Sequence, residues 1–189
     1  MERVKTKKKD IACLESLWDS DIEQPLTVAP ILGVIAKRHH VRVSHLTCNT
    51  KEELEFSIKE LPSRSSYRIL YLAFHGMPGK IELGDGSIVT LEELAGLMET
   101  KFKGWVVHFG TCGTLSAGRK QLQRFLESTQ TSLLIGYKGG VDWVDSAAMD
   151  LIVLDWLQEF KNLRALWNQI RIDYAGLIQL TGLTVFPRV

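Results

Sequence analysis

The sequence predicts one α/β domain in which helices cover both faces of a mainly parallel β-sheet. Short apolar segments typical of strands alternate along the 189 residues with segments of helical pattern. Two of the apolar segments, 67–74 and 104–110, are almost continuously hydrophobic, as expected of strands that are buried on both faces. A helix between two strands makes a right-handed crossover, so this alternation favours parallel strands between two layers of helices.

In the first half of the chain, capping and turn residues separate the predicted elements. Either Asn49 or Thr50 can cap a helix, because Glu52 and Glu53 follow in its first turn. Pro62 ends that helix, since proline cannot donate a backbone hydrogen bond. The predicted elements are strands at 10–17, 41–48 and 67–74, and helices at 31–40 and 51–61.

The second half begins with a cluster of turn residues at 75–79 and a small hairpin around Gly84-Asp-Gly. Thr90 is expected to cap a short helix, with Glu93 at the capping-box position three residues later. The predicted elements are hairpin strands at 80–83 and 87–89, helices at 91–98, 117–127, 146–160 and 163–180, and strands at 104–110, 132–137 and 183–186.

Composition and charge point away from nucleic acid and membrane partners. The chain carries 23 basic and 22 acidic residues, a net charge of +1, so no large field favours an anionic partner. The one basic run lies within residues 1–9, which we expect to form a flexible tail ahead of a single domain at 10–189. No apolar run approaches the ~20 residues that span a bilayer.

Three widely spaced cysteines form neither a disulfide framework nor a paired metal site. The charged N-terminus lacks the apolar stretch of a signal peptide. We therefore expect a cytoplasmic protein with reduced thiols.

Two chemically able side chains follow directly after buried strands. His75 ends one apolar run and Cys112 ends another, and each precedes a glycine, Gly76 and Gly113. Ligands of parallel sheets bind beyond the carboxyl ends of the strands. The separation of 112 − 75 = 37 residues fits one crossover, which would make the two strands neighbours. His75 and Cys112 are therefore the candidate catalytic pair.

The chemistry of a cysteine hydrolase suits this arrangement. Its nucleophile is the thiolate, which a following helix N-terminus and a nearby imidazole favour. His75 would act as general acid and then as general base. The N–H groups of Gly76 and Cys112 are candidate donors to the oxyanion that develops on the substrate carbonyl.

The passages Leu72-Ala-Phe-His-Gly-Met-Pro-Gly-Lys-Ile-Glu-Leu-Gly-Asp-Gly, Val89-Thr-Leu-Glu-Glu-Leu and Val106-Val-His-Phe-Gly-Thr-Cys-Gly-Thr-Leu resemble the caspase-like (clan CD) cysteine peptidases. The likeness is closest to the bacterial CHAT branch, and it extends to residues 134–148. The resemblance covers about residues 67–160, most of the domain, and implies a caspase-like three-layer sandwich with a peptidase domain at 10–189.

The resemblance assigns the catalytic histidine to His75, the nucleophile to Cys112 and oxyanion donation to Gly76. It implies hydrolysis of a protein or peptide substrate without metal or cofactor, with an activating or sensor protein as a possible partner, in bacterial defence or stress signalling. Relatives usually carry a small apolar residue where this chain has Thr111. The caspase sequence Gln-Ala-Cys-Arg-Gly is absent, so aspartate specificity is not implied.

Several relatives that cleave after Arg or Lys place a carboxylate at the base of the first substrate pocket. Asp142 and Asp145 are the candidates here, and Trp143 is a candidate lining residue. Asp145, with Ser146, is expected rather to cap the following helix, whereas a role for Asp142 in the pocket stays an open alternative. The hypothesis that follows is a preference for a basic P1 residue.

Alternatives remain at the level of sequence. Cys48 also ends a strand and is the rival nucleophile, although neither glycine nor histidine follows it. The same fold could serve as an inactive interaction module that docks a partner protein. A nucleotide-binding domain is disfavoured, because the chain lacks a Gly-x-Gly-x-x-Gly turn and a Gly-Lys-Ser/Thr phosphate loop.

Overall fold

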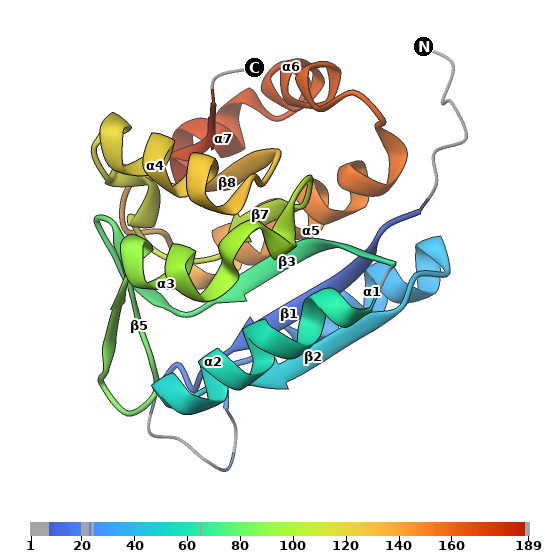
Figure 1. The fold of residues 1–189 in the computed structure, drawn as a ribbon. Coiled ribbons are helices and arrows are strands. Elements are labelled where there is room, and N and C mark those ends of the chain that lie inside the picture. Colours follow the sequence, from blue (N-terminus) through green and yellow to red (C-terminus); the bar gives the residue numbers. More distant parts are fainter. Residues whose placement is uncertain (1–7, 20–22, 24, 65, 188–189) are drawn as a thin grey trace.

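A six-stranded sheet forms the middle layer of the computed structural model, which describes residues 8–19, 23, 25–64 and 66–187 (Figure 1). Its strand order is β2-β1-β3-β7-β8-β9, and every neighbouring pair is parallel except β8 and β9. The predicted α/β class with a mainly parallel sheet is confirmed. The strands are β1 (Asp10–Glu15), β2 (Val43–Thr47), β3 (Tyr67–Ala73), β7 (Val106–Phe109), β8 (Leu133–Tyr137) and β9 (Leu183–Phe186).

Helices cover both faces of this sheet (Figure 1). Along β3, Leu70 and Leu72 pack into the core on one face, while Ile69 and Tyr71 pack into the core on the other. Both faces of the central strand are thus dry, as its unbroken apolar sequence predicts. The first face is covered by α2 (Lys51–Glu60), α3 (Leu91–Met98) and α4 (Arg119–Thr129), and the second by α1 (Ala29–His39), α5 (Trp143–Glu159), α6 (Leu163–Asp173) and α7 (Ala175–Thr181).

Local capping explains where two helices start. The Thr50 hydroxyl accepts from the N–H of Glu53, whose carboxylate accepts from the N–H of Thr50 in return. Thr90 and Glu93 make the same reciprocal pair at the start of α3. Such a box satisfies two backbone donors that the helix leaves open. The predicted bounds of α3 are confirmed, as are those of the final strand β9.

Two segments differ from the prediction in the kind or number of elements, beyond small shifts in bounds. The turn expected at 75–79 is shorter, because His75–Met77 forms a strand, β4, and Pro78 and Gly79 alone make the turn. Gly79 has a φ of 73°, which the third position of such a Pro-Gly turn requires. A separate three-stranded antiparallel sheet results, with β5 (Lys80–Glu82) and β6 (Ile88–Thr90).

The helix predicted at 163–180 is divided in two. Tyr174 separates α6 from α7 with non-helical backbone angles, φ −126° and ψ 32°. Its ring lies edge-on against Trp156 of α5, with centroids 5.6 Å apart. Packing against the neighbouring helix thus breaks a pattern that is helical by sequence alone.

The end of the predicted tail is held against the domain. Lys9 donates from its backbone N–H to the side chain of Gln158 (2.9 Å) and from Nζ to the carbonyl oxygen of Leu157 (2.6 Å). Lys8 forms an ion pair with Glu159. The remainder of that tail, residues 1–7, lies outside the described residues.

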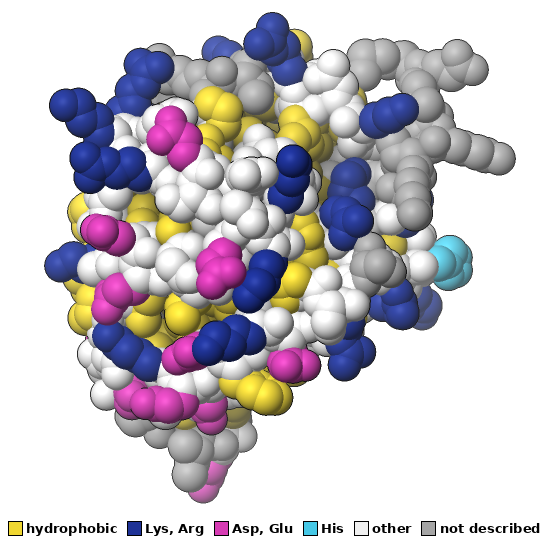
Figure 2. All heavy atoms as spheres, in the orientation of Figure 1, with side chains coloured by type: hydrophobic (Ala, Val, Ile, Leu, Met, Phe, Trp, Pro, Cys, Tyr) yellow, Lys and Arg dark blue, Asp and Glu magenta, His cyan; other side chains and the backbone are white. Residues whose placement is uncertain are grey.

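Basic and acidic side chains occur together over the face of the molecule in Figure 2. In the part of the chain that the structure describes, no helix has both the length and the apolar character that a membrane span requires.

Candidate active site

His75 and Cys112 lie at the carboxyl ends of two neighbouring parallel strands. β3 and β7 pair in register from Ile69 opposite Val106 to Leu72 opposite Phe109. His75 follows β3 after one residue, and Cys112 follows β7 after two. The predicted juxtaposition of the two strand ends is therefore confirmed. Both side chains line one pocket of about 140 Å³.

The ring of His75 is held by the loop that follows β1. Its Nε2 lies 2.6 Å from the carbonyl oxygen of Trp18. Because a carbonyl oxygen can only accept, this contact requires a proton on Nε2, and the other nitrogen, Nδ1, is then the acceptor of the neutral ring. The Trp18 ring also lies edge-on against the imidazole, with centroids 5.3 Å apart. Trp18 was not foreseen from the sequence, because its loop has no recognisable pattern.

Cys112 is half-buried, and its sulfur lies 3.9 Å from the carbonyl oxygen of Val141. The expected α-helix does not begin directly after it. Gly113 adopts φ 66° and starts a single 3₁₀ turn, Thr114–Ser116, whereas α4 begins only at Arg119. A thiolate at Cys112 would therefore not lie directly at the N-terminus of a long helix.

The loop that carries Cys112 is joined to the hairpin that carries His75. The Thr111 hydroxyl donates to the Thr114 hydroxyl (2.7 Å), which donates to the carbonyl oxygen of Lys80 (3.0 Å). Thr111 is 1% exposed, so this hydrogen bond gives a structural reason for threonine at a position where relatives have a small apolar residue.

Gly76 fits against the Cys112 loop only because it has no side chain. A Cβ at this position would lie 2.6 Å from the carbonyl oxygen of Cys112 and 2.8 Å from the Cβ of Thr111. The close approach brings the backbone of the histidine strand onto the backbone of the cysteine loop. The N–H of Cys112 donates no hydrogen bond to any residue that the structure describes, which leaves it available to a ligand.

The two acids expected in the substrate pocket lie outside its lining. Asp142, not Asp145, caps α5: its Oδ1 accepts from the N–H groups of Val144 (2.8 Å) and Asp145 (3.3 Å). The prediction that Asp145 is the cap is wrong because the helix begins three residues earlier than its sequence pattern suggests. Trp143 does line the pocket, where its ring lies edge-on against that of Trp18, with centroids 4.9 Å apart.

A different carboxylate, Asp150 of α5, lies in the pocket lining. It is 3% exposed, and it accepts from the Tyr71 hydroxyl (2.6 Å), from Nε2 of His108 (2.6 Å) and from the Tyr137 hydroxyl. The donors come from three neighbouring strands. The sequence offers one sign of this cluster, an acid on the face of α5 that also buries Met149 and Val153.

Burial raises the pKa of Tyr71 and of Tyr137 well above its usual value, and the charge of Asp150 adds to the effect. Both phenols therefore stay protonated and remain donors. Nδ1 of His108 has no hydrogen-bond partner in the described residues.

The rival nucleophile Cys48 does not line the pocket of His75 and Cys112. Cys48 is fully buried, and its thiol lies 3.4 Å from the Ser57 hydroxyl. Burial raises the pKa of this thiol, which disfavours the reactive thiolate. Cys13 is also fully buried, and burial raises its pKa well above the usual value. Of the three cysteines, Cys112 alone is not fully buried.

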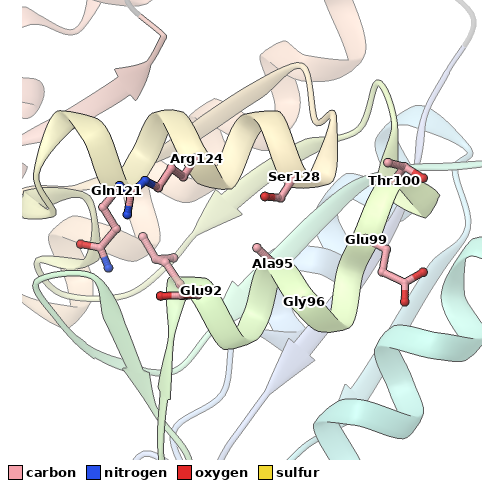
Figure 3. Close-up of a pocket in the computed structure, with 9 residues that line it drawn as sticks. Glu92, Ala95, Gly96, Glu99, Thr100, Gln121, Arg124 and Ser128 are labelled. Carbon is pink, nitrogen blue, oxygen red and sulfur yellow. The ribbon is translucent and has the colours of Figure 1, made fainter.

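The described residues offer no metal site beside this pocket, and a larger hollow lies apart from it. The described residues contain no group of three or more His, Cys, Asp or Glu side chains placed to hold a metal ion. A larger hollow of about 460 Å³ lies between α3 and α4, where Glu92 and Arg124 are among the lining side chains (Figure 3). It shares no residue with the pocket of His75 and Cys112.

The profile of a family of unknown function (DUF6642) matches residues 8–186, and the chain belongs to that family. In structure, the chain is similar to the Drosophila initiator caspase Dronc, with a TM-score of 0.57 and 9% sequence identity over 88% of this chain and 74% of that one. A likeness at this identity shows the fold alone, and the expected caspase-like fold is confirmed. No curated protein matches the sequence.

Proposed function

We propose that this member of a family of unknown function is a cysteine endopeptidase with His75 and Cys112 as its catalytic pair. One observation carries the proposal: a histidine and an accessible cysteine follow two adjacent parallel strands and line the same pocket. A caspase-like fold provides the matching architecture, and the motifs around His75 and Cys112 resemble the CHAT branch of the caspase-like peptidases.

The reaction follows from the state of the two side chains. His75 accepts the thiol proton at Nδ1, because Nε2–H is engaged by the carbonyl oxygen of Trp18. The thiolate of Cys112 attacks the carbonyl carbon of the peptide bond, and a tetrahedral intermediate forms. His75 returns the proton to the leaving amine as the C–N bond breaks, which leaves a thioester. Water, deprotonated by the same imidazole, then releases the acid and the thiol.

The oxyanion of the intermediate requires donors beside the sulfur. The free N–H of Cys112 and the closely approaching backbone of Gly76 support the assignment of this role to these two residues. In well-studied enzymes each such donor contributes about 3–4 kcal/mol to stabilising the transition state. None of the proposed steps uses a metal or an organic cofactor.

A basic P1 residue of the substrate fits this pocket, through Asp150 rather than through Asp142 or Asp145. The Asp150 carboxylate lies in the lining, and the rings of Trp18 and Trp143 form aromatic walls. Aromatic faces and a buried carboxylate together favour a guanidinium or ammonium group over an anion. The proposed substrate is accordingly a protein or peptide that is cleaved after Arg or Lys.

The test is covalent labelling of the full chain by peptidyl acyloxymethyl ketones, read by intact mass. A probe with Arg at P1 is expected to label wild type stoichiometrically at one site and to leave Cys112→Ala unlabelled. The matched control Cys48→Ala should label like wild type, because its thiol is buried. Absence of labelling with any P1 residue, while a small alkylator still reaches Cys112, would favour the inactive docking module.

Specificity has its own comparison. Citrulline has the shape of arginine without its charge, so the ratio of labelling rates for Arg and citrulline probes isolates the charge. We expect a ratio on the order of 100, falling to about ten or less in Asp150→Asn. Asp142→Asn and Asp145→Asn should leave the ratio unchanged. Equal cleavage of reporters with Arg and Asp at P1 would rule out the basic preference.

A further inference from the structure

Glu15 is a buried carboxylate close to the pocket that the proposed reaction does not use. It is the last residue of β1 and is 5% exposed. A lone carboxylate at such a site is costly unless hydrogen bonds replace its lost hydration. The donors that contact Glu15 therefore indicate which groups it holds in place.

Four donors surround this carboxylate. Oε1 accepts from the indole N–H of Trp18 (2.8 Å) and from the backbone N–H of Val28 (2.9 Å). Oε2 accepts from the Thr27 hydroxyl (2.7 Å) and lies 2.5 Å from Nε2 of His45. Burial alone would raise the pKa of Glu15, but these hydrogen bonds, with that of His45 the largest, hold it below its usual value. The carboxylate is thus ionised and fully engaged at neutral pH.

Trp18 and Val28 lie at the two ends of the loop between β1 and α1, so Glu15 holds both ends at once. Trp18 of this loop lines the pocket and contacts His75. The carbonyl oxygen of this residue receives Nε2–H of His75, and its ring packs against the rings of His75 and Trp143. The indole N–H is fixed by Glu15 at one side of Trp18, while the carbonyl fixes the imidazole at the other.

We propose that Glu15 is a positioning residue, which holds Trp18 so that its carbonyl oxygen keeps the His75 ring in the orientation and tautomer that leave Nδ1 free for the Cys112 thiol. This inference rests on the proposed peptidase function. Glu15 does not line the pocket itself; it reaches the pocket through Trp18 and Val28, which both donate to it and both line the pocket, and of these two only Trp18 contacts His75 through a hydrogen bond and its ring. A small displacement of a catalytic group lowers the reaction rate, because the reacting atoms must be held within a narrow range of distances and angles.

The variants separate this role from general stability. Glu15→Ala removes every acceptor, whereas Glu15→Gln keeps one oxygen for Trp18 and Val28. Trp18→Phe keeps the backbone carbonyl and a smaller aromatic ring, and it loses the indole N–H that Glu15 binds. The matched control is Asp10→Asn, a buried carboxylate at the opposite end of the same strand, where it accepts from the backbone N–H and from Nε of Arg42.

In the intact chain, Glu15→Ala and Trp18→Phe are expected to lower kcat about tenfold to a hundredfold, and Glu15→Ala is expected to change KM by less than about threefold. Glu15→Gln should recover most of the rate, and Asp10→Asn should match wild type. Long-range proton–nitrogen spectra should show His75 as one Nε2–H tautomer in wild type and as a mixture in Glu15→Ala and Trp18→Phe. Trp18→Phe keeps the test valid if Glu15→Ala does not fold.

The two readouts distinguish the failure of this inference from the failure of the proposed function. Folded variants with an unchanged kcat and an unchanged tautomer of His75 would overturn the positioning role. A wild-type protein without peptidase activity would overturn the function, yet the spectra would still report whether Glu15 orders His75 through Trp18.

Discussion

Tyr71 and His108 face one another across β3 and β7, with ring centroids 5.1 Å apart and an interplanar angle of 21°, and both donate to the carboxylate of Asp150. Asp150 belongs to α5, so this polar cluster ties the helix that contributes to the pocket wall to the centre of the sheet. A hydrogen bond contributes more to stability inside a buried core than at the surface, and removing one partner of a buried network is correspondingly costly.

Removal of the Asp150 carboxylate should therefore destabilise the fold as well as alter specificity. We expect Asp150→Ala to lower the free energy of unfolding by about 3–5 kcal/mol, because two phenols and an imidazole lose a charged acceptor in a buried site. Urea denaturation followed by circular dichroism measures the change. Asp145→Ala on the same helix is the control, and a loss below 1 kcal/mol for Asp150→Ala would contradict the inferred network.

The same cluster predicts sensitivity to alkali. The pKa of Tyr71 and of Tyr137 is raised in the folded state, mainly by burial and then by Asp150. The unfolded chain loses these phenolic protons near pH 10, so the associated stability is complete below that pH and declines as pH rises above it. Thermal unfolding between pH 9 and pH 11 should show a smaller decline in Tyr71→Phe than in wild type. A parallel decline in both proteins would refute the assignment.

Acid should weaken the fold through Glu15 and Asp10. Burial would raise the pKa of each carboxyl, but hydrogen bonds outweigh it and hold both values low, those of His45 on Glu15 and of Ser66 and Arg42 on Asp10. Their contribution is present above the unfolded values of 4.5 and 3.8 and is lost as pH falls through the lower folded values. The drop in melting temperature from pH 6 to pH 3 should be smaller in Glu15→Gln than in wild type. An equal drop would mean that Glu15 is protonated alike in both states.

A methyl group at Gly76 should disable the site. Its Cβ would lie 2.6 Å from the carbonyl oxygen of Cys112, so the histidine strand and the cysteine loop must separate. We expect Gly76→Ala to lower kcat/KM by about a hundredfold or more. In the matched control Gly96→Ala, a Cβ in the interior of α3 meets nothing within 4 Å, and the protein should gain up to about 1 kcal/mol of stability with unchanged activity.

Sequence predicted best what is decided locally. The bounds of α3 follow from Thr90 and Glu93, three residues apart, and the buried strands follow from unbroken apolar runs. The neighbouring positions of His75 and Cys112 were predictable as well, because one crossover separates their strands.

The contacts that the sequence did not predict join residues that are far apart along the chain. Asp150 finds its donors at positions 71, 108 and 137, and Trp18 meets His75 at a separation of 57 residues. No local pattern marks such contacts. The sequence pattern favours Asp145 over Asp142 as the cap of α5 for a related reason: three acids and hydroxyls lie within the five positions 142–146, and only the backbone geometry selects one of them.

The antiparallel strand β9 has a consequence for the order of assembly on the ribosome. Lys138 links two regions: its N–H donates to the carbonyl oxygen of Gly182 just before β9, and its own carbonyl accepts from Ser116, four residues after Cys112. The strands that precede His75 can pair among themselves once residue 73 has emerged, since β2, β1 and β3 are neighbours. The brace behind the cysteine loop closes only after residues 182–186 have been made. A growing chain therefore lacks this support for the cysteine loop until its last strand has been made.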